Sequence, residues 1–524
     1  MSEHKAIFKS AGVLSAFTIL SRITGFFRDV LIANVFGTGM AAQAFFVAFK
    51  IPNMLRDVMG EGAGNAAFVP VFCEYISRKT REDFLKLVNS LFILLLAVSA
   101  AVVCAGVVFA SPLVRLIAPG FSVDPAKFKL TVDLTRILFP YLLLVTVSAY
   151  LMSVANSLRS FAVSGSASTV FNLFMIAAIF PIANIEGVGA IYALSVAVLL
   201  AGVAQAAVQV PSLLRLGVDF RKGGCYEHPL KNEAIRKIGR LISPRIVGTS
   251  IYQLNIFVDT IFASLSFFVG EGAIAAVYYA NRIIQFPFSV FGVAISNAAL
   301  PAMSAHSAGK DMDKFRMTLD FCFKAAFLCI IPLTAGILIF SAPIVRAVFE
   351  RGRFDAYSTA ITSKAVFFYG LGLIGYVGVR FFSLGFYALQ DTVTPVKSSG
   401  IALVMNVLMN SFFIFVLRLG LSGLALASSI SATANFIILY RSMKSKAGYS
   451  FSPDLKRLVS KALSASVVMG AAAWSLWRIA FGASATLAIL CCVAFFGAMV
   501  YFFILWRWDV NEIRELVNWL KRKR

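Results

Sequence analysis

Apolar runs of about 20 residues recur from one end of the chain to the other, and this feature limits the fold more than any other. The runs 91–110 and 487–506, for example, contain no charged residue. A helix of about 20 apolar residues is long enough to cross the hydrocarbon core of a bilayer. Inside the bilayer every backbone N–H and C=O group must be paired within the protein, which leaves helices or closed barrels. Neither run alternates apolar and polar residues as barrel strands do, so the sequence predicts an all-α polytopic membrane protein.

The composition agrees with this class and excludes several others. Of the 524 residues 59% are hydrophobic and only 14% are charged, whereas a soluble domain carries about 25% charged residues. We find no phosphate-binding loop of the form GxxxxGK[ST] and no convergent nucleophile, acid–base pair or metal-ligand set, so we expect no enzyme activity, no cofactor and no certain metal site. The seven cysteines form no CxxC pair and are interpreted as small apolar residues.

Apolar runs separated by charged, glycine or proline residues predict about fourteen membrane spans. We place them at 8–36, 41–73, 86–110, 129–155, 161–183, 187–211, 238–269, 273–304, 317–340, 358–386, 393–417, 421–441, 458–479 and 484–507. Very short connections are expected at Gly37–Gly39 and Gly270–Gly272.

The basic residues between these spans fall mainly on one side of the membrane. That side collects roughly thirty lysines and arginines against about eight on the other, and the positive-inside rule makes it cytoplasmic. Both termini are then cytoplasmic, which requires an even number of spans and agrees with fourteen. The formal net charge of +23 is interpreted as a topology signal and as attraction to anionic lipid headgroups, not as a nucleic-acid surface. We therefore expect a multi-pass protein of the bacterial cytoplasmic (inner) membrane.

The chain also divides into two similar halves. We predict an N-lobe at 1–211, a cytoplasmic linker at 212–237, a C-lobe at 238–441 and two further helices with a basic tail at 442–524. In each half the second span contains a proline, Pro52 or Pro287, followed by an Asn-Ala-Ala box. Repeated halves with the substrate at their interface are a common plan in transporters. The alternative is chance recurrence, since small residues are favoured wherever membrane helices pack closely.

Several basic residues lie inside predicted spans, where a charge costs on the order of 3 kcal/mol and should face a partner or a cavity. For Arg136, Lys324 and Lys364 we prefer a structural ion pair or an end-of-span position. Four others lie on the first two helices of one half or on the second helix of the other: Arg22, Arg28, Arg56 and Arg282. The planar fork of arginine donates two hydrogen bonds to a phosphate, so this set predicts an anion site. A structural role is the alternative.

Carboxylates in or near the spans are the second set of candidates. Asp29 follows Arg28 directly, and Glu61 lies five residues after Arg56. Asp259 and Asp391 could bind a coupling cation. Pairing of these two carboxylates with Arg380 or Lys397 is an equally acceptable interpretation.

The residues that carry these features resemble the MurJ (MviN) lipid II flippases. The matching segments are Ser21–Asp29, Ala44–Arg56, Glu61–Gly62 with Ala67–Pro70, Ala118–Phe121, Tyr278–Arg282 with Phe286–Pro287, and Gly385–Asp391 with Thr394–Pro395. The resemblance covers nearly the whole chain, and the motifs of the first two spans are specific. It implies the fold of the multidrug/oligosaccharidyl-lipid/polysaccharide exporter superfamily, with two pseudo-symmetric six-helix lobes and two extra C-terminal helices.

The resemblance also implies roles for single residues. Arg22, Arg28, Arg56 and Arg282 match the cationic central cavity that engages the diphosphate, and Asp29 and Glu61 match acidic gating or ion-pair positions. This sequence has Gln43, Asn281 and Gln285 where the family often has acids, which makes the cavity more basic and argues against a carboxylate gate there. The two C-terminal helices are implied to form an apolar groove for the polyprenyl tail.

The function implied is export of lipid II, the undecaprenyl-diphosphate-linked peptidoglycan precursor, to the outer leaflet by alternating access, and hence peptidoglycan synthesis, cell-wall biogenesis and cell shape. The partners implied are lipid II and the membrane, with cell-wall synthesis proteins left open. Four alternatives remain. A flippase for another polyprenyl-linked glycan fits the charges equally well. A cation-coupled drug antiporter of the same superfamily would need acids in its cavity. A membrane-embedded enzyme would need a convergent nucleophile, acid–base or metal group, which we do not find, and an interaction scaffold without transport would need no buried basic cavity.

Overall fold

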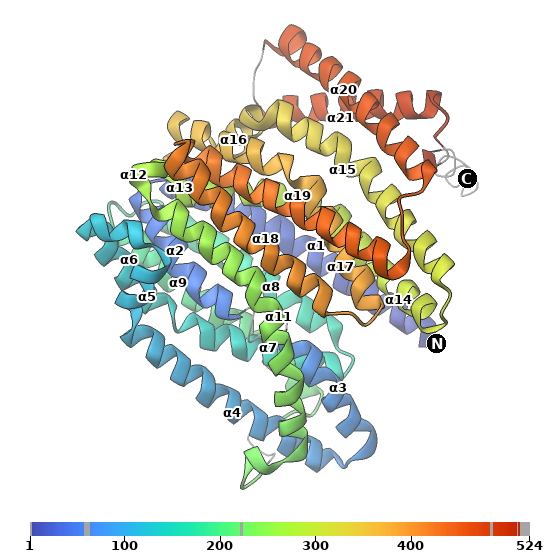
Figure 1. Ribbon diagram of the computed structural model, residues 1–524. Helices are drawn as coiled ribbons and strands as arrows, with labels where there is room; N and C mark the ends of the chain where they lie inside the picture. The colour runs from blue at the N-terminus through green and yellow to red at the C-terminus, as the bar shows by residue number, and fades with distance from the viewer. Residues whose placement is uncertain (1–2, 57–62, 221–223, 483–485, 511, 514–524) are drawn as a thin grey trace. The chain divides into compact units, whose positions relative to one another are not determined.

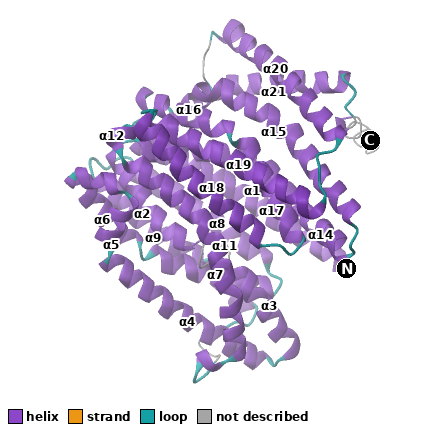
Figure 2. Cartoon of the chain, viewed as in Figure 1, coloured by secondary structure: helices purple, strands orange, loops and turns teal. Residues whose placement is uncertain are grey.

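The computed structural model of the 524-residue chain describes residues 3–56, 63–220, 224–482, 486–510, 512 and 513. In these residues every regular element is a helix and none is a strand, as Figures 1 and 2 show. Within the described ranges, ten helices or helix pairs are long and apolar enough to cross a membrane, or eleven if the bent pair Ala356–Leu371 and Leu373–Ala388 is one span. The fold is therefore that of an all-α polytopic membrane protein, and the count of fourteen spans stays a prediction.

Contacts between residues divide the chain into unit 1, Met1–Leu265, and unit 2, Ser266–Arg524. Unit 1 contains α1 (Glu3–Phe36), α2 (Met40–Arg56), α3 (Ala63–Arg78), α4 (Arg81–Val108), α5 (Ala110–Ile117), η2 (Pro119–Val123), α6 (Pro125–Leu138), α7 (Tyr141–Ser157), α8 (Phe161–Ile182), α9 (Gly189–Ala207), α10 (Val210–Arg215), η3 (Pro229–Lys231) and α11 (Glu233–Ser264). The first helix of the predicted C-lobe, α11, thus makes its contacts with the helices of the first half. The lobe boundaries predicted from the sequence stay a prediction.

Unit 2 contains the remaining helices. They are α12 (Ser266–Val269), α13 (Ala273–Pro287), the π-helical η4 (Phe288–Val293), α14 (Ala294–Ala308), α15 (Met312–Phe349), α16 (Ala356–Leu371), α17 (Leu373–Ala388), α18 (Val393–Ser411), the π-helical η5 (Phe412–Val416), α19 (Gly420–Ala447), α20 (Pro453–Phe481) and α21 (Leu487–Arg507).

Local sequence signals set many of the helix ends. Thr80 begins α4 by accepting a hydrogen bond from the Asp83 N–H, and Asn232 begins α11 in the same way, as N-cap residues do. The predicted three-residue connections lie where the glycines indicated. Gly37 between α1 and α2 has φ 56°, and Gly272 before α13 has φ 82°, a left-handed conformation that glycine adopts without steric cost.

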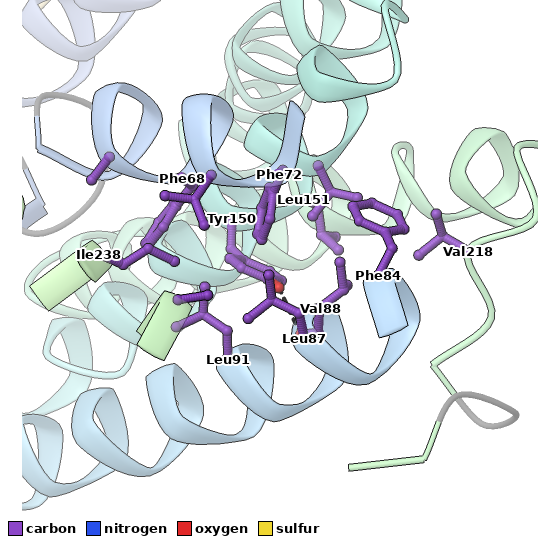
Figure 3. Packing of buried hydrophobic residues seen from close by; sticks show 14 of the residues in the cluster. Phe68, Phe72, Phe84, Leu87, Val88, Leu91, Tyr150, Leu151, Val218 and Ile238 are labelled. Carbon is purple, nitrogen blue, oxygen red and sulfur yellow. Dashed lines mark hydrogen bonds between the residues drawn. The ribbon is translucent and has the colours of Figure 1, made fainter. Parts of the chain in front are cut away.

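A buried cluster in unit 1 joins α3, α4, α7 and the segment that follows α10 (Figure 3). Phe72 of α3 meets Phe84 of α4 and Tyr150 of α7 edge-to-face, with ring centroids 6.0 Å apart in both pairs. The Tyr150 hydroxyl donates to the Val88 carbonyl at 2.6 Å. Val218, from the predicted cytoplasmic linker, is fully buried in the same cluster. The described part of this linker is therefore packed onto unit 1.

In unit 2 an aromatic cluster joins the segment before α20 to α15 and α19. The ring of Phe451 stacks on Tyr440 with centroids 4.5 Å apart. Asp320 of α15 accepts hydrogen bonds from the Tyr449 hydroxyl at 3.1 Å and from the Ser452 hydroxyl at 2.6 Å. Ser452 is in turn the N-cap of α20, so the buried carboxylate of Asp320 fixes where this C-terminal helix begins.

Candidate functional site

Arg28 and Asp29 form an ion pair inside α1. The Asp29 Oδ1 atom accepts from Nη2 of Arg28 at 2.7 Å and from Nε at 3.0 Å. The side chain of Asp29 is 1% exposed and that of Arg28 is 11% exposed. The pairing predicted from their adjacency is confirmed. A charge pair this far from solvent remains stable only when both partners are present, because either charge alone is costly to bury.

Asn172 of α8 completes this site. Its Oδ1 atom accepts from Nη1 of Arg28 at 3.0 Å, and its Nδ2 atom donates to the Ser21 carbonyl at 2.9 Å. A Cβ atom on Gly25 would meet Nδ2 of Asn172 at 3.2 Å, so the missing side chain gives the amide room against α1. No sequence motif indicated Asn172, whose only signal is that it is an amide in an otherwise apolar span.

The other three arginines of the predicted set occupy different surroundings. Arg22 lies six residues before Arg28 on α1, which rotates it by about 240° around the helix, and it is exposed where Arg28 is mostly buried. Arg56 is the last residue of α2 and is half-buried. Arg282 of α13 is half-buried, and its Nη2 atom donates to the Tyr278 hydroxyl at 2.7 Å. Glu61, the predicted partner near Arg56, lies outside the described residues.

Arg282 also contacts an aromatic face. Its guanidinium carbon lies 4.7 Å from the centroid of the Tyr278 ring, four residues earlier on the same helix. The cation–π contact and the hydroxyl acceptor orient the guanidinium. Of the two neighbouring amides, Asn281 is half-buried and Gln285 is exposed.

A second polar site joins α2 to α11. The Lys50 ammonium donates to the Thr260 hydroxyl at 2.7 Å, and the neighbouring carboxylate of Asp259 attracts the same ammonium. Asp259, predicted as a coupling-ion ligand, therefore lies near Lys50. The two residues are 209 positions apart in the chain, and no sequence pattern linked them.

A third polar site joins α2 to α6. Lys127 is only 3% exposed, and its ammonium donates to Oε1 of Gln43 at 3.2 Å. The same nitrogen lies 4.3 Å from the centroid of the Phe121 ring. Gln43, where the resemblance leads us to expect an acid, thus contacts a buried lysine. The charge distribution predicts Lys127 only as one of the few basic residues on the outer side.

Asp391 lies outside the predicted spans, at the turn between α17 and α18. Its Oδ2 atom accepts from the Lys446 ammonium at 2.6 Å and from the Thr394 hydroxyl at 2.6 Å. Partial burial acts to raise the pKa of Asp391, but the hydrogen bonds from Lys446 and Thr394 outweigh burial and lower it to about 2. Of the two interpretations of Asp391, a coupling-cation ligand or a partner of Arg380 or Lys397, the pairing is wrong, because the end of α19 brings Lys446 to the turn.

Arg380, the other residue named for that pairing, lies on α17 and donates its Nε hydrogen to the Ser296 hydroxyl of α14 at 3.1 Å. Within the described part of the chain no three or more His, Cys, Asp or Glu residues are grouped as metal ligands. The structure therefore brings together Arg28 with Asp29 and Asn172, Lys50 with Thr260 and Asp259, and Lys127 with Gln43.

These three sites put cationic groups among apolar helices of unit 1, each oriented by polar neighbours. Such an arrangement can hold an anion, because a guanidinium or ammonium that is already desolvated and oriented loses little entropy on binding it. The Asp29 carboxylate occupies the guanidinium fork of Arg28 in the way that a phosphate oxygen would.

The family model described as "Lipid II flippase MurJ" matches residues 32–494 of the chain. A protein of Burkholderia cenocepacia named "Lipid II flippase MurJ" is 31% identical over 515 residues, which cover 95% of this chain and 97% of that protein. A "Probable lipid II flippase MurJ" of Vibrio cholerae serotype O1 is 33% identical over 487 residues, or 90% of each chain.

Solved structures give the same comparison for the fold. "Lipid II flippase MurJ, inward closed conformation" superposes with a TM-score of 0.78 at 25% identity and covers 96% of this chain and 99% of that one. An inward-facing multidrug resistance transporter of the MATE family and MOP superfamily gives a TM-score of 0.70 at 14% identity, covering 85% of this chain and 99% of that one. This second likeness is one of fold alone.

Proposed function

Because the chain belongs to the lipid II flippase MurJ family, we propose that it exports lipid II, the polyprenyl-diphosphate-linked peptidoglycan precursor. It is a multi-pass protein of the bacterial inner membrane that serves peptidoglycan synthesis. The headgroup of lipid II carries a diphosphate, which would pay a large desolvation cost in crossing hydrocarbon without compensating charge. Alternating access solves this problem by offering the headgroup a polar path while the tail stays in lipid.

The observation that carries the proposal is the set of hydrogen bonds that hold Arg28 of α1 between Asp29 and Asn172. Three donor nitrogens of Arg28 are hydrogen-bonded to Asp29 and Asn172, and both charged side chains are nearly inaccessible to solvent. A diphosphate that enters here competes with Asp29 for the guanidinium fork. Asp29 is then the counterion of Arg28 in the absence of substrate, and the diphosphate replaces it. The free energy of substrate binding therefore depends on the difference between the two anions as partners of Arg28.

The remaining substrate contacts are assigned to Arg22, Arg56 and Arg282. Support for Arg282 comes from its orientation, because the Tyr278 ring and hydroxyl hold the guanidinium in a fixed direction. Arg22 is exposed on α1, where an incoming headgroup can reach it before Arg28. Glu61 is kept as the gating partner that the family resemblance implies for the end of α2.

Orientation and energy supply complete the proposal. Both termini are placed in the cytoplasm by the excess of basic residues on that side. Moving one charge across the membrane potential is worth about 2.3 kcal/mol per 100 mV, which can drive export without ATP hydrolysis.

Asp259 is kept as the candidate ligand for a coupling ion, which would compete with the Lys50 ammonium for the carboxylate. Asp391 is the weaker candidate, because Lys446 already neutralises it. Cell-wall synthesis proteins are proposed as partners on the family resemblance alone.

The test is complementation of a bacterium depleted of its own lipid II flippase. The parent chain is compared with Arg28→Ala, Arg56→Ala and Arg282→Ala, with Arg136→Ala as matched control. Arg136 is also a basic residue of a predicted span, but its side chain is 50% exposed and pairs with Asp133 at 3.8 Å.

Rescue by the parent and by Arg136→Ala, with failure of the other three at equal membrane levels, is the expected result. No rescue by a well-inserted parent would point to another polyprenyl-linked glycan. Rescue by all variants would show that the arginines are structural and would remove the proposed substrate site.

A further inference from the structure

Asn172 of α8 makes hydrogen bonds in two directions, and both lead to α1. Its Oδ1 atom accepts from Nη1 of Arg28 at 3.0 Å, and its Nδ2 atom donates to the Ser21 carbonyl at 2.9 Å. An amide has an acceptor end and a donor end, so these two partners fix which end faces the guanidinium. A side chain of the same size without both ends, such as Asp or Leu, cannot make both bonds.

The position of this amide along α1 is set by the packing of the two helices. A Cβ atom on Gly25 would lie 3.2 Å from Nδ2 of Asn172, and a Cβ atom on Gly165 would lie 2.8 Å from the Cβ atom of Phe17. The two contacts are about two helical turns apart on each helix. Close packing at both places prevents α8 from sliding along α1, and Asn172 itself is only 6% exposed.

The guanidinium of Arg28 is therefore held from two sides. From α1, the Asp29 carboxylate accepts from Nε and Nη2. From α8, Asn172 accepts from Nη1 and the Phe171 ring centroid lies 5.9 Å from the guanidinium carbon. Phe171 is in turn packed on Tyr141 of α7, with ring centroids 5.6 Å apart. The partner from α1 is charged, whereas the partners from α8 are neutral.

This difference in charge matters when one anion replaces another. In the proposed function the diphosphate takes the place of Asp29 beside Arg28. An arginine side chain has many rotamers, and a guanidinium released by Asp29 would have to be ordered again at a cost in binding free energy. The bond to Asn172 keeps it ordered. A carboxylate at position 172 would order it equally well, but it would be a second anion that the substrate has to displace.

We propose that Asn172 is a positioning residue for the diphosphate. It keeps the guanidinium of Arg28 directed at the substrate after Asp29 has been displaced, and it does not compete with the substrate because its amide is neutral. The inference rests on the proposed function, in which Arg28 receives the diphosphate. Asn172 acts through Arg28 and is assigned no substrate contact of its own.

The experiment measures the binding of undecaprenyl diphosphate to the purified full chain in mixed micelles, per folded protein, and the midpoint of thermal unfolding. Asn172→Leu removes both hydrogen bonds at similar volume. Asn172→Asp keeps the acceptor that faces Arg28 and adds a negative charge. Thr24→Val is the matched control. The Thr24 hydroxyl lies 3.5 Å from Nδ2 of Asn172 and donates to the Leu20 carbonyl, so its loss alters the contact between α1 and α8 and leaves the bond to Arg28 in place.

We expect Asn172→Leu and Asn172→Asp to weaken binding by about tenfold or more, the factor that one hydrogen bond to a charged group supplies, and Thr24→Val to bind like the parent. Binding at the parent level in both Asn172 variants overturns the proposal. An equal loss in Thr24→Val overturns it as well, because the packing of α1 on α8, and not the bond to Arg28, would then set the affinity.

A charge swap separates positioning from packing. The double variant Asp29→Asn/Asn172→Asp returns a carboxylate to Arg28 from the side of α8. Its second oxygen would face the Ser21 carbonyl, but the hydroxyls of Ser21 and Thr24, each 3.5 Å from the present Nδ2 atom, can donate to it. We expect the swap to regain about half or more of the unfolding midpoint that Asp29→Asn loses, because the buried guanidinium again has a counterion.

No recovery in the swap overturns the proposal, since the side chain at 172 would then not direct the guanidinium. If Asp29→Asn alone is not inserted, insertion of the double variant counts as the recovery. The two readouts also separate this inference from the proposed function. A parent chain that does not bind undecaprenyl diphosphate counts against lipid II as substrate, while the swap still decides whether Asn172 directs Arg28. Binding by the parent and equally by both Asn172 variants removes the positioning role and leaves export in place.

Discussion

The clearest quantitative expectation concerns the buried ion pair of α1, and the perturbation is Asp29→Asn. The substitution keeps the shape of the side chain and removes its charge, so the Arg28 guanidinium stays buried without this counterion. The two side chains are 1% and 11% exposed, so water cannot replace the lost charge. Breaking a buried pair by removing one partner costs about 3–5 kcal/mol, and we expect the free energy of unfolding to fall by an amount in this range.

The double variant Arg28→Met/Asp29→Asn separates stability from function. Replacing both members of a buried pair by groups of similar volume is often close to neutral, so we expect most of the lost stability to return. Transport should not return, because the guanidinium that the proposal assigns to the diphosphate is gone. An outcome in which the double variant is stable and inactive would locate the function in Arg28 itself.

The assay is chemical denaturation of the purified chain in mixed micelles, followed by the complementation test. Asp133→Asn is the matched control, because Asp133 and Arg136 also pair on one helix of a predicted span, but with side chains 31% and 50% exposed. An exposed pair is worth at most about 1 kcal/mol, so the control should change little. If Asp29→Asn proves as stable as Asp133→Asn, the reasoning from burial is refuted.

Two further perturbations test other parts of the structure. Gly378→Ala puts a Cβ atom 2.2 Å from the ring of Phe436 and should cost about 1–3 kcal/mol of unfolding free energy by overpacking. Gly336→Ala, with nothing within 4 Å, should be neutral or stabilising by up to about 1 kcal/mol. Burial opposes ionisation of the Asp391 carboxylate, but the hydrogen bonds from Lys446 and Thr394 outweigh it and lower the pKa from 3.8 to about 2. The carboxylate therefore contributes stability that is complete above pH 3.8 and is lost as the pH falls towards 2. The folded fraction of the parent in micelles should therefore decline across that interval more steeply than that of Asp391→Asn, and parallel curves would contradict the assignment.

The described structure confirms several expectations that depend on neighbours in the sequence. The connections at Gly37–Gly39 and Gly270–Gly272 and the ion pair of Arg28 with Asp29 are of this kind. Each involves residues within one or two helical turns, so the covalent chain already holds them together. The predicted pairing of Asp391 with Arg380 or Lys397 is wrong, because its partner Lys446 lies 55 residues away in the chain and is brought to Asp391 only by the packing of the helices.

By itself the sequence determined that this chain is an all-α polytopic membrane protein. That property follows from the length of the apolar runs, which acts on single segments. Only the tertiary structure decided three hydrogen bonds between distant segments. They join Asn172 to Arg28, Gln43 to Lys127 and Gly120 to Ser264. In a membrane, lipid satisfies an apolar side chain as well as another helix does, so hydropathy does not say which helix faces meet. Polar side chains select those faces, and their partners are fixed only once the helices are packed.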